Sequence, residues 1–478
     1  MKGNVSRIQK RIFRATREGD FRKVRNLQKF LSGSRAAALV AVRRVTQVNQ
    51  GKRTAGIDGK IYSKDVEKEE LVSEVQSINW DMYRCSLVRR VYIPKPRKIE
   101  KRPLGIPTIK DRVLQMVVKL ALEPEWECKF EQNSYGFRPG RRCMDAIWVI
   151  HAAIAATLKG NTSAWIFDAD IEKCFDRIDH EALLKKLPMF TNVLRRWLKA
   201  GAIEFGHLIK TKKGTPQGGI ISPLLANIAL DGMDRLFGAV SRNGNYIRPS
   251  DRRGRNKGIV VIRYADDFVI LAPSREILIE YVIPRVCEFL AERGLALKGA
   301  KTRIVHREQG FEFLGFRIQQ HISKYAKLCA VTPTKDNIKH LLGDKKDILM
   351  THKQTTQAEL IDILNPRIRG WAYYYRYCHA KRAFVCVDSR IFRMLWWWAR
   401  RRHKPENKGA KWVKDKYFPR IGSRKWTFAD KPTHPLFYAS TMRCDMREYR
   451  KVKGEASPFD PALEKYWSER HGEIPQFT

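Results

Sequence analysis

Two groups of aspartates stand beside short runs of β-forming residues. VIRYADDFVIL sets Asp266 and Asp267 side by side between two such runs. SAWIFDADIEKCFDRIDH carries Asp168 and Asp170 at the end of another. A carboxylate at the end of an apolar strand is costly to desolvate unless a cation meets it. Both stretches therefore favour a cation-binding site.

The spacing of these carboxylates predicts the chemistry of that site. Alternation with a period of two places Asp168 and Asp170 on one face of the predicted strand. Three carboxylates from two strands would suit two divalent cations, which clamp the attacking and leaving oxygens of a phosphoryl transfer. The alternative for Asp266 and Asp267 is a polar hairpin turn without a ligand. Spacing alone does not choose between Asp168 and Asp170.

The composition indicates a polyanionic partner. The chain has 478 residues, with 93 Lys+Arg against 50 Asp+Glu and a formal net charge of +43, so nucleic acid is expected rather than a membrane surface. Its start lacks the apolar core of a signal peptide, and no stretch of 18 apolar residues occurs, so we expect a cytoplasmic protein. The nine cysteines include no C-x-x-C pair, which argues against structural zinc.

The elements that must position the aspartates follow from the patterning. Residues 1–50 predict a basic amphipathic helix pair, with either a nucleic-acid-binding or a merely solvated charged face, and residues 51–60 a loop. From 85 to 320, short β runs alternate with helical stretches. RCSLVRRVYIPKPRKIEKRPLGIPT predicts two strands around a basic turn, because its prolines exclude a helix. Such a concentration of cations on a hairpin suits phosphate binding.

The order of several motifs resembles that of a bacterial reverse transcriptase, and more narrowly of a group II intron-encoded reverse transcriptase and maturase. The series over roughly residues 50–320 is SYGFRPGRRC, DADIEKCFDRIDH, GTPQGGIISPLLANIALDGMD, YADD, GLALKGAKTRI and FEFLGF. The resemblance implies that Asp170, Asp266 and Asp267 bind two Mg²⁺ ions. It chooses Asp170 because Phe175 then falls where reverse transcriptases hold the residue that excludes a ribose 2′-OH. The alternative for Phe175 is a core residue.

The resemblance also implies substrate-binding residues. Gln217 of TPQGG would lie near the templating base pair, with glycines that allow a close backbone approach. Lys95 and Arg102 would hold the incoming triphosphate, and Lys301 of AKTR would neutralise or protonate pyrophosphate. Otherwise TPQGG is a plain turn, and each of these cations is one among 93.

The C-terminal part is predicted to be helical, aromatic and basic. NPRIRGWAYYYR resembles the maturase thumb, which carries over Arg367, Arg369 and Trp371 as a motif, although aromatic residues there could simply fill a helical core. The basic and aromatic residues that follow suit backbone neutralisation with base stacking and resemble the family's DNA-binding region. The candidates in it are Arg400, Arg401, Arg402, Lys411 and Trp412.

These expectations combine into an α+β right-hand polymerase. We expect a basic helical extension and loop over 1–60, fingers and palm over 61–320, an all-helical thumb/maturase domain over 321–400, and a basic DNA-binding region with a remnant linker over 401–478. The tail from 441 resembles the approach to an HNH nuclease but offers only Cys444 and His471, so no zinc and no intrinsic DNA endonuclease are expected.

The expected activity is RNA-directed DNA polymerisation of dNTPs on an RNA template with a DNA primer. Resemblance and charge add binding of a group II intron RNA to assist splicing, and retrohoming by target-primed reverse transcription at a DNA target. One alternative is a reverse transcriptase recruited to another role, such as antiviral defence. Another is a splicing cofactor that only binds RNA, which would be expected to have lost the three aspartates.

Overall fold

The chain folds into two compact units. The computed structural model describes residues 2–94, 100–155, 164–204, 207–209, 213–215, 218–238, 258–299, 302–322, 327–403 and 409–472. Unit 1 contains residues 1–153, 161–304 and 452–478, and unit 2 contains 154–160 and 305–451. The sequence predicted one basic DNA-binding region with a remnant linker over 401–478, whereas residues 452–472 belong to unit 1.

The N-terminal helices of unit 1 are α1 (Lys2–Arg17), α2 (Phe21–Ser32), α3 (Arg35–Arg43) and α4 (Asp65–Gln76). The apolar spacing read from the sequence is the buried face of the first two, since Ile12, Val24 and Leu31 are fully buried. Helices α1, α2 and α3 pack against the long helix α5 (Ile109–Lys129). The N-terminal region therefore contributes to the core of unit 1.

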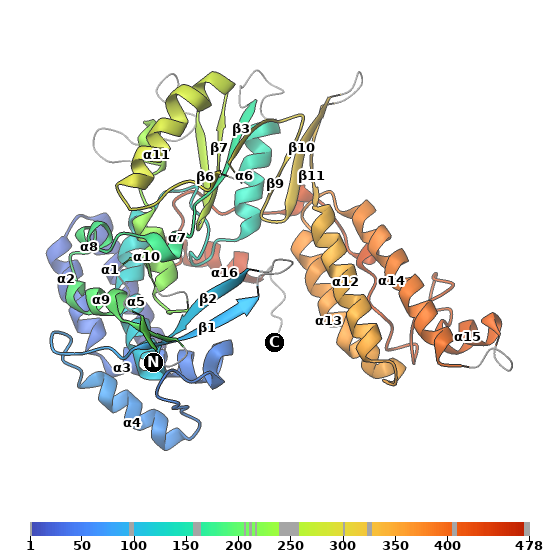
Figure 1. Cartoon of the computed structure of the whole chain (residues 1–478), viewed down its shortest axis with the longest axis horizontal. Helices are drawn as coiled ribbons and strands as arrows, with labels where there is room; N and C mark the ends of the chain where they lie inside the picture. Colours follow the sequence, from blue (N-terminus) through green and yellow to red (C-terminus); the bar gives the residue numbers. More distant parts are fainter. Residues whose placement is uncertain are drawn as a thin grey trace. The chain divides into compact units, whose positions relative to one another are not determined.

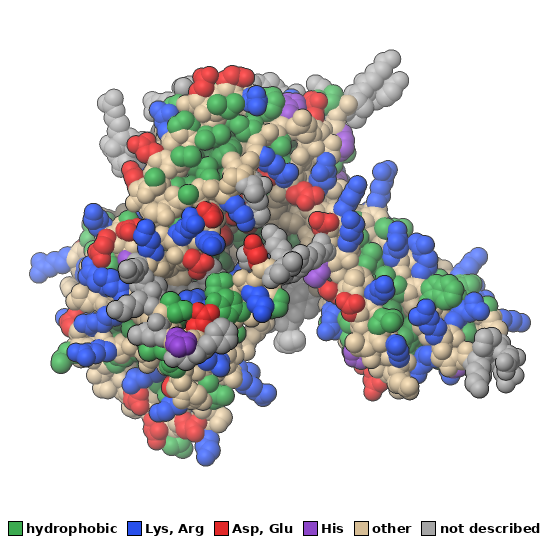
Figure 2. Space-filling model, viewed as in Figure 1, with side chains coloured by type: hydrophobic (Ala, Val, Ile, Leu, Met, Phe, Trp, Pro, Cys, Tyr) green, Lys and Arg blue, Asp and Glu red, His purple; other side chains and the backbone are tan. Residues whose placement is uncertain are grey.

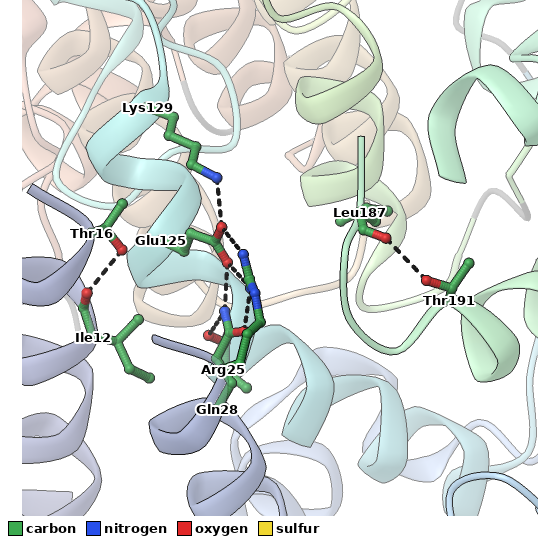
Figure 3. Close-up of polar contacts among 9 residues, drawn as sticks. Ile12, Thr16, Arg25, Gln28, Glu125, Lys129, Leu187 and Thr191 are labelled. Carbon is green, nitrogen blue, oxygen red and sulfur yellow. Dashed lines mark hydrogen bonds and ion pairs between the residues drawn. The ribbon is translucent and has the colours of Figure 1, made fainter. Parts of the chain in front are cut away.

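One polar cluster ties α2 to α5. The carboxylate of Glu125 is fully buried and accepts two hydrogen bonds from Arg25, at 2.6 and 2.7 Å, and one from Gln28 at 2.7 Å. Lys129 adds an ion pair at 2.5 Å from the next turn of α5. Figure 3 shows these three side chains pointing at Glu125. The buried charge is thus fully paired, as stability requires.

A four-stranded sheet forms the predicted basic hairpin and extends it. Strands β1 (Val88–Pro94) and β2 (Lys101–Ile106) pair antiparallel. Strands β4 (Ala202–Glu204) and β5 (His207–Ile209) complete the order β2-β1-β4-β5. The predicted hairpin is confirmed, and the turn between its strands lies outside the described residues.

A second sheet carries the aspartates. Its order is β6-β7-β3-β8, with β6 (Val260–Tyr264), β7 (Asp267–Ala272), β3 (Trp165–Asp170) and β8 (Arg303–His306) (Figure 1). Strand β7 is buried on both faces except at Asp267. Unit 1 also contains the following helices: α6 (Cys143–Ala155), α7 (Cys174–Arg177), α8 (His180–Lys185), α9 (Thr191–Lys199), α10 (Ser222–Ala229), α11 (Ile283–Ala291) and α16 (Glu464–Gly472).

Unit 2 joins a small sheet to a helical bundle. The sheet consists of β9 (Phe311–Phe313), β10 (Phe316–Ile322) and β11 (Lys327–Pro333). The bundle consists of α12 (Lys335–Thr351), α13 (Gln357–Tyr375), α14 (Lys381–Arg401) and the short α15 (Ala410–Tyr417) (Figure 1). The all-helical prediction over 321–400 is wrong at its start, because β11 pairs along its whole length with β10. No described helix is both long and apolar enough to cross a membrane.

Candidate active site and nucleic-acid surface

Asp170 and Asp267 lie directly opposite each other. They are register partners at the end of the antiparallel pair β3–β7. Asp266 precedes β7 in the hairpin turn, where Ala265 has a φ of 58°. A non-glycine residue in this left-handed region is strained and often marks a functional turn. The three aspartates predicted from the sequence thus meet at one end of the sheet.

The structure separates Asp168 from Asp170. Arg303, in the AKTRI stretch, donates from its Nε to the Oδ2 of Asp168 at 2.8 Å, and its Nη2 forms an ion pair with the same oxygen at 2.8 Å. Asp168 is opposite Val269, two register positions from Asp267. The register therefore places Asp170, rather than Asp168, directly opposite Asp267.

The carboxylates of Asp170 and Asp266 both act on the thiol of Cys174. The pKa of the Cys174 thiol is raised by burial, then by the negative charge of Asp266 and by that of Asp170. Within the described ranges, however, no three His, Cys, Asp or Glu side chains already converge as metal ligands do. The backbone places the carboxylates together, and side-chain rotation would have to complete a coordination sphere.

A buried arginine is hydrogen-bonded to the aspartate turn. Arg263 is 1% exposed and donates to the Oδ1 of Asn227 at 3.0 Å and to the carbonyl of Ala265 at 3.2 Å. Asn227, on α10, donates in turn to the carbonyl of Gly136 at 2.8 Å. Arg263 therefore links the strained turn to two other segments of unit 1.

The SYGFRPG stretch closes this network from the other side. The N–H of Tyr135 donates to the carbonyl of Arg263 at 2.9 Å. A Cβ at Gly136 would lie 2.3 Å from the backbone nitrogen of Ala265, so only glycine permits this approach. The sequence identified the stretch only as one motif of the family series and did not predict this contact. Its dense glycines and arginines were the available signal for a close backbone contact.

Phe137 is a candidate that the sequence reasoning missed. Its φ is 60°, which makes this bulky residue a conformational outlier, and its side chain is 51% exposed. Its ring meets the ring of Phe175 edge to face at 6.3 Å between centroids. Phe137 thus adjoins the residue predicted to exclude the ribose 2′-OH.

Phe175 lies on α7, five residues after Asp170, and is partly buried. The N–H of Thr215 donates to its carbonyl at 2.6 Å. A Cβ at Gly214, whose φ is 85°, would collide with the backbone of Phe175 and Asp176. The structure therefore brings the start of the GTPQGG stretch against the Phe175 turn.

The same stretch reaches the basic hairpin. Gly218, with a φ of 121°, brings its Cα against the carbonyl of Gly105 on β2, 2.8 Å from where a Cβ would stand. Gln217 itself lies outside the described residues, as do Lys95 and Lys301. Arg102 is exposed on β2, on the same hairpin as Gly105.

Comparison with known proteins agrees with this arrangement. Three family models match: reverse transcriptase (RNA-dependent DNA polymerase) over residues 93–318, the N-terminal domain of reverse transcriptase over 1–75, and the group II intron maturase-specific domain over 338–418. Protein YkfC of Escherichia coli K12 is 33% identical over 323 residues, 62% of this chain and 83% of that protein. This chain belongs to the group II intron reverse transcriptase and maturase family.

Two further relatives support this membership. Group II intron-encoded protein LtrA of Lactococcus lactis is 28% identical over 405 residues, 68% of this chain and 66% of LtrA. Maturase-like protein 1 of Euglena gracilis is 26% identical over 379 residues, 78% of this chain and 74% of that protein. The chain is thus an RNA-directed DNA polymerase with a maturase domain, and enzymes with this polymerase domain use divalent metal ions.

In the maturase region, the predicted motif residues divide between surface and interior. Arg367 and Arg369 are exposed on α13, and the guanidinium of Arg369 lies 5.2 Å from the ring centroid of Phe437. Trp371 packs against Tyr375 and Phe384, with ring centroids 5.0 and 5.4 Å apart. The two arginines thus lie at the surface, whereas Trp371 helps to build the bundle.

The basic candidates after α14 also differ from one another. Arg400, Arg401 and Lys411 are exposed. Arg402 instead donates to the carbonyls of residues 353 and 355, at 2.9 and 2.6 Å, so it joins the end of α14 to the α12–α13 connection. The ring of Trp412 is partly buried and stacks edge-on against His403 at 4.6 Å.

Proposed function

We propose that Asp170, Asp266 and Asp267 bind two Mg²⁺ ions and that this site extends a DNA primer on an RNA template. The observation that carries the proposal is the direct register of Asp170 with Asp267, beside Asp266 in a strained turn. Carboxylate oxygens are the ligands that Mg²⁺ prefers. When bound there, two Mg²⁺ ions supply a clamp on the attacking and leaving oxygens.

The reaction would join a primer 3′-OH to the α-phosphate of a dNTP. A new P–O bond forms as the 3′-OH gives up its proton to water, and the bond to the β-phosphate breaks, so pyrophosphate carries the leaving electron pair. The protein would mainly position the reactants. Phe175 would reject a ribose 2′-OH, Gln217 would lie near the templating pair, Lys95 and Arg102 would hold the triphosphate, and Lys301 would meet the pyrophosphate.

The partner of the second activity is a group II intron RNA. The maturase-specific match over 338–418 and the net charge of +43 support binding of that RNA to assist its splicing, with the RNA supplying the splicing chemistry. Arg367, Arg369, Trp371, Arg400 to Arg402, Lys411 and Trp412 are the predicted contacts. Retrohoming by target-primed reverse transcription would add a DNA target, and all these steps would take place in the cytoplasm.

Primer extension tests the polymerase assignment. Purified protein with an RNA template, an annealed DNA primer, dNTPs and Mg²⁺ should produce full-length cDNA, and a chelator should stop it. Absence of extension under these conditions would contradict the proposal. A search of the DNA flanking the reading frame for a group II ribozyme tests the intron partner, and its absence would favour a reverse transcriptase recruited to another role.

A further inference from the structure

A groove with an apolar floor and a basic rim runs between α12 and α14 in unit 2. Its volume is about 640 Å³, within the range of sites that hold small ligands or single groups of larger ones. It lies within the residues that match the maturase-specific domain. Of the residues predicted from the sequence to bind nucleic acid, Arg401 and Arg402 line this groove.

The floor of the groove is preformed. The indole N–H of the buried Trp398 donates to the carbonyl of His352 at 3.1 Å. The guanidinium of Arg402 lies 4.4 Å from the Trp398 ring centroid and is held by the carbonyls of Lys353 and Thr355. These contacts fix the loop after α12 against the end of α14, so a ligand would not have to order the floor on binding.

One wall presents unusually exposed apolar side chains. Trp397 is 56% exposed and Met350 is 49% exposed, and both line the groove. Tryptophan is enriched at interfaces, and exposed apolar side chains that lie together with polar groups around them mark interaction surfaces. Its neighbour Trp398 on the same helix is only 6% exposed. The exposure of Trp397 therefore follows from the side of α14 on which it lies.

The rim is cationic. Lys346, Lys353 and Arg401 line the groove, and no hydrogen bond or ion pair to the described part of the chain engages any of their side-chain nitrogens. The described residues lining the groove include no carboxylate. Figure 2 shows Lys and Arg side chains scattered around hydrophobic ones over α12 and α14, with few acidic side chains.

We propose that this groove binds one unpaired nucleotide of a folded RNA, with its base stacked on Trp397 and its flanking phosphates on Lys346, Lys353 and Arg401. Aromatic faces with nearby cations recognise unstacked bases, whereas a base within a duplex has both faces covered. The uncompensated positive rim favours a nucleic acid over an apolar protein segment. The inference rests on the proposed binding of structured RNA by the maturase region.

The test uses the full chain and three synthetic probes. The first is an RNA hairpin with one bulged 2-aminopurine, the second is the same hairpin fully paired, and the third is the DNA version of the bulged hairpin. Dissociation constants and 2-aminopurine fluorescence are measured at one salt concentration. The variants are Trp397→Ala and Trp397→Phe, with Val385→Ala and Arg393→Ala as controls from exposed positions on α14 outside the groove.

The expected result is a preference of about tenfold for the bulged over the paired RNA, which is the size of one base stacked on an aromatic ring, with quenched fluorescence. Trp397→Ala should abolish the preference and Trp397→Phe should retain most of it. Arg393→Ala should weaken the binding of both RNAs equally, and Val385→Ala should change the binding of neither.

Three outcomes would overturn the inference. They are equal binding of bulged and paired RNA by the wild type, an undiminished preference in a folded Trp397→Ala variant, and equal binding of the bulged DNA. These outcomes differ from a failure of the proposed function, in which the wild type would bind neither RNA or extend no primer. A partner protein that covers Trp397 without competing with RNA would also overturn the inference, because the occupant of the groove would then be a protein.

Discussion

Asp170 on β3 faces Asp267 on β7 as its direct cross-strand partner. Like charges directly opposite each other destabilise an antiparallel pair, and the neighbouring strand residues are buried. In the proposed site, two divalent cations would offset this repulsion between the carboxylates.

Replacing Asp266 with Asn should abolish cDNA synthesis, a loss of at least about 100-fold, because an amide cannot replace the carboxylate charge at the metals. Intron RNA binding and splicing assistance should persist, since they use cationic surfaces. Primer extension and RNA binding measured on the same preparation check this. Asp168→Asn is the matched control and should cost far less activity, because Asp168 pairs with Arg303. Extension at a tenth of the normal rate in Asp266→Asn would contradict the metal assignment.

The Phe175 position should control sugar selectivity. Phe175→Ala should raise incorporation of rNTPs relative to dNTPs by a steric amount, a few kcal/mol at most. Phe137→Ala should shift selectivity less, and the two effects should not add, because the rings are in contact and contacting residues couple. Single-nucleotide kinetics on the two single variants and the double variant measure this. Unchanged selectivity in a folded Phe175→Ala protein would mean that Phe175 is only a core residue.

Arg263 should act as a positioning residue for the aspartate turn. Arg263→Lys cannot donate to both Asn227 and Ala265 in the same geometry, so kcat should fall about 10- to 100-fold with little change in the KM for dNTP. Asn227→Ala should give the same split, because it breaks the same link to Gly136. Steady-state kinetics together with thermal unfolding separate this effect from simple loss of fold. A folded Arg263→Lys protein with normal kcat would refute the role.

RNA binding should depend strongly on salt. Neutralising phosphates releases counterions, so log K should fall with log salt by about 0.9 per contact for a duplex and about 0.7 for a single strand. A slope equal to several contacts is expected from the basic surface of unit 2. Titrations between low and physiological salt measure it, and a nearly flat line would contradict the polyanion argument.

The Glu125 cluster should make stability depend on acid. Burial opposes ionisation of Glu125, but hydrogen bonds from Arg25 and Lys129 outweigh it and lower its pKa to about 2. Because the folded pKa lies below the unfolded value of about 4.3, the stabilisation of about 3 kcal/mol is complete above that value and disappears as the pH falls towards 2. Denaturant unfolding of unit 1 at several pH values should show this loss.

Glu125→Gln is the matched variant for that measurement. It should destabilise the protein by about 3 kcal/mol at neutral pH, because Arg25 and Lys129 lose their buried partner, and it should flatten the dependence between about pH 4.3 and pH 2. An unchanged acid dependence in the variant would mean that another carboxylate is responsible.

Local patterns were sufficient for the strands and the carboxylate pair. Period-two alternation and β-forming residues specify β3, β6 and β7 within a few positions, and prolines exclude a helix from the β1–β2 hairpin. The beginning of unit 2 escaped this reasoning, because β11 is a strand through its pairing with β10. Long-range pairing of this kind leaves little signal within its own residues.

The amino-acid sequence by itself determined the chemistry of this protein: which carboxylates are available, a net charge that calls for a polyanion, and an order of motifs shared with one family. Only the tertiary structure decided which of them meet. It paired Asp168 with Arg303, and it placed Gly136 beside the aspartate turn and Phe137 beside Phe175. It also placed residues 452–472 in unit 1, where Arg470 forms a buried ion pair with Asp145 at 2.9 Å. The physical reason is that residue types and local periodicity are properties of the chain, whereas close backbone approach and buried ion pairs depend on contacts between residues far apart in it.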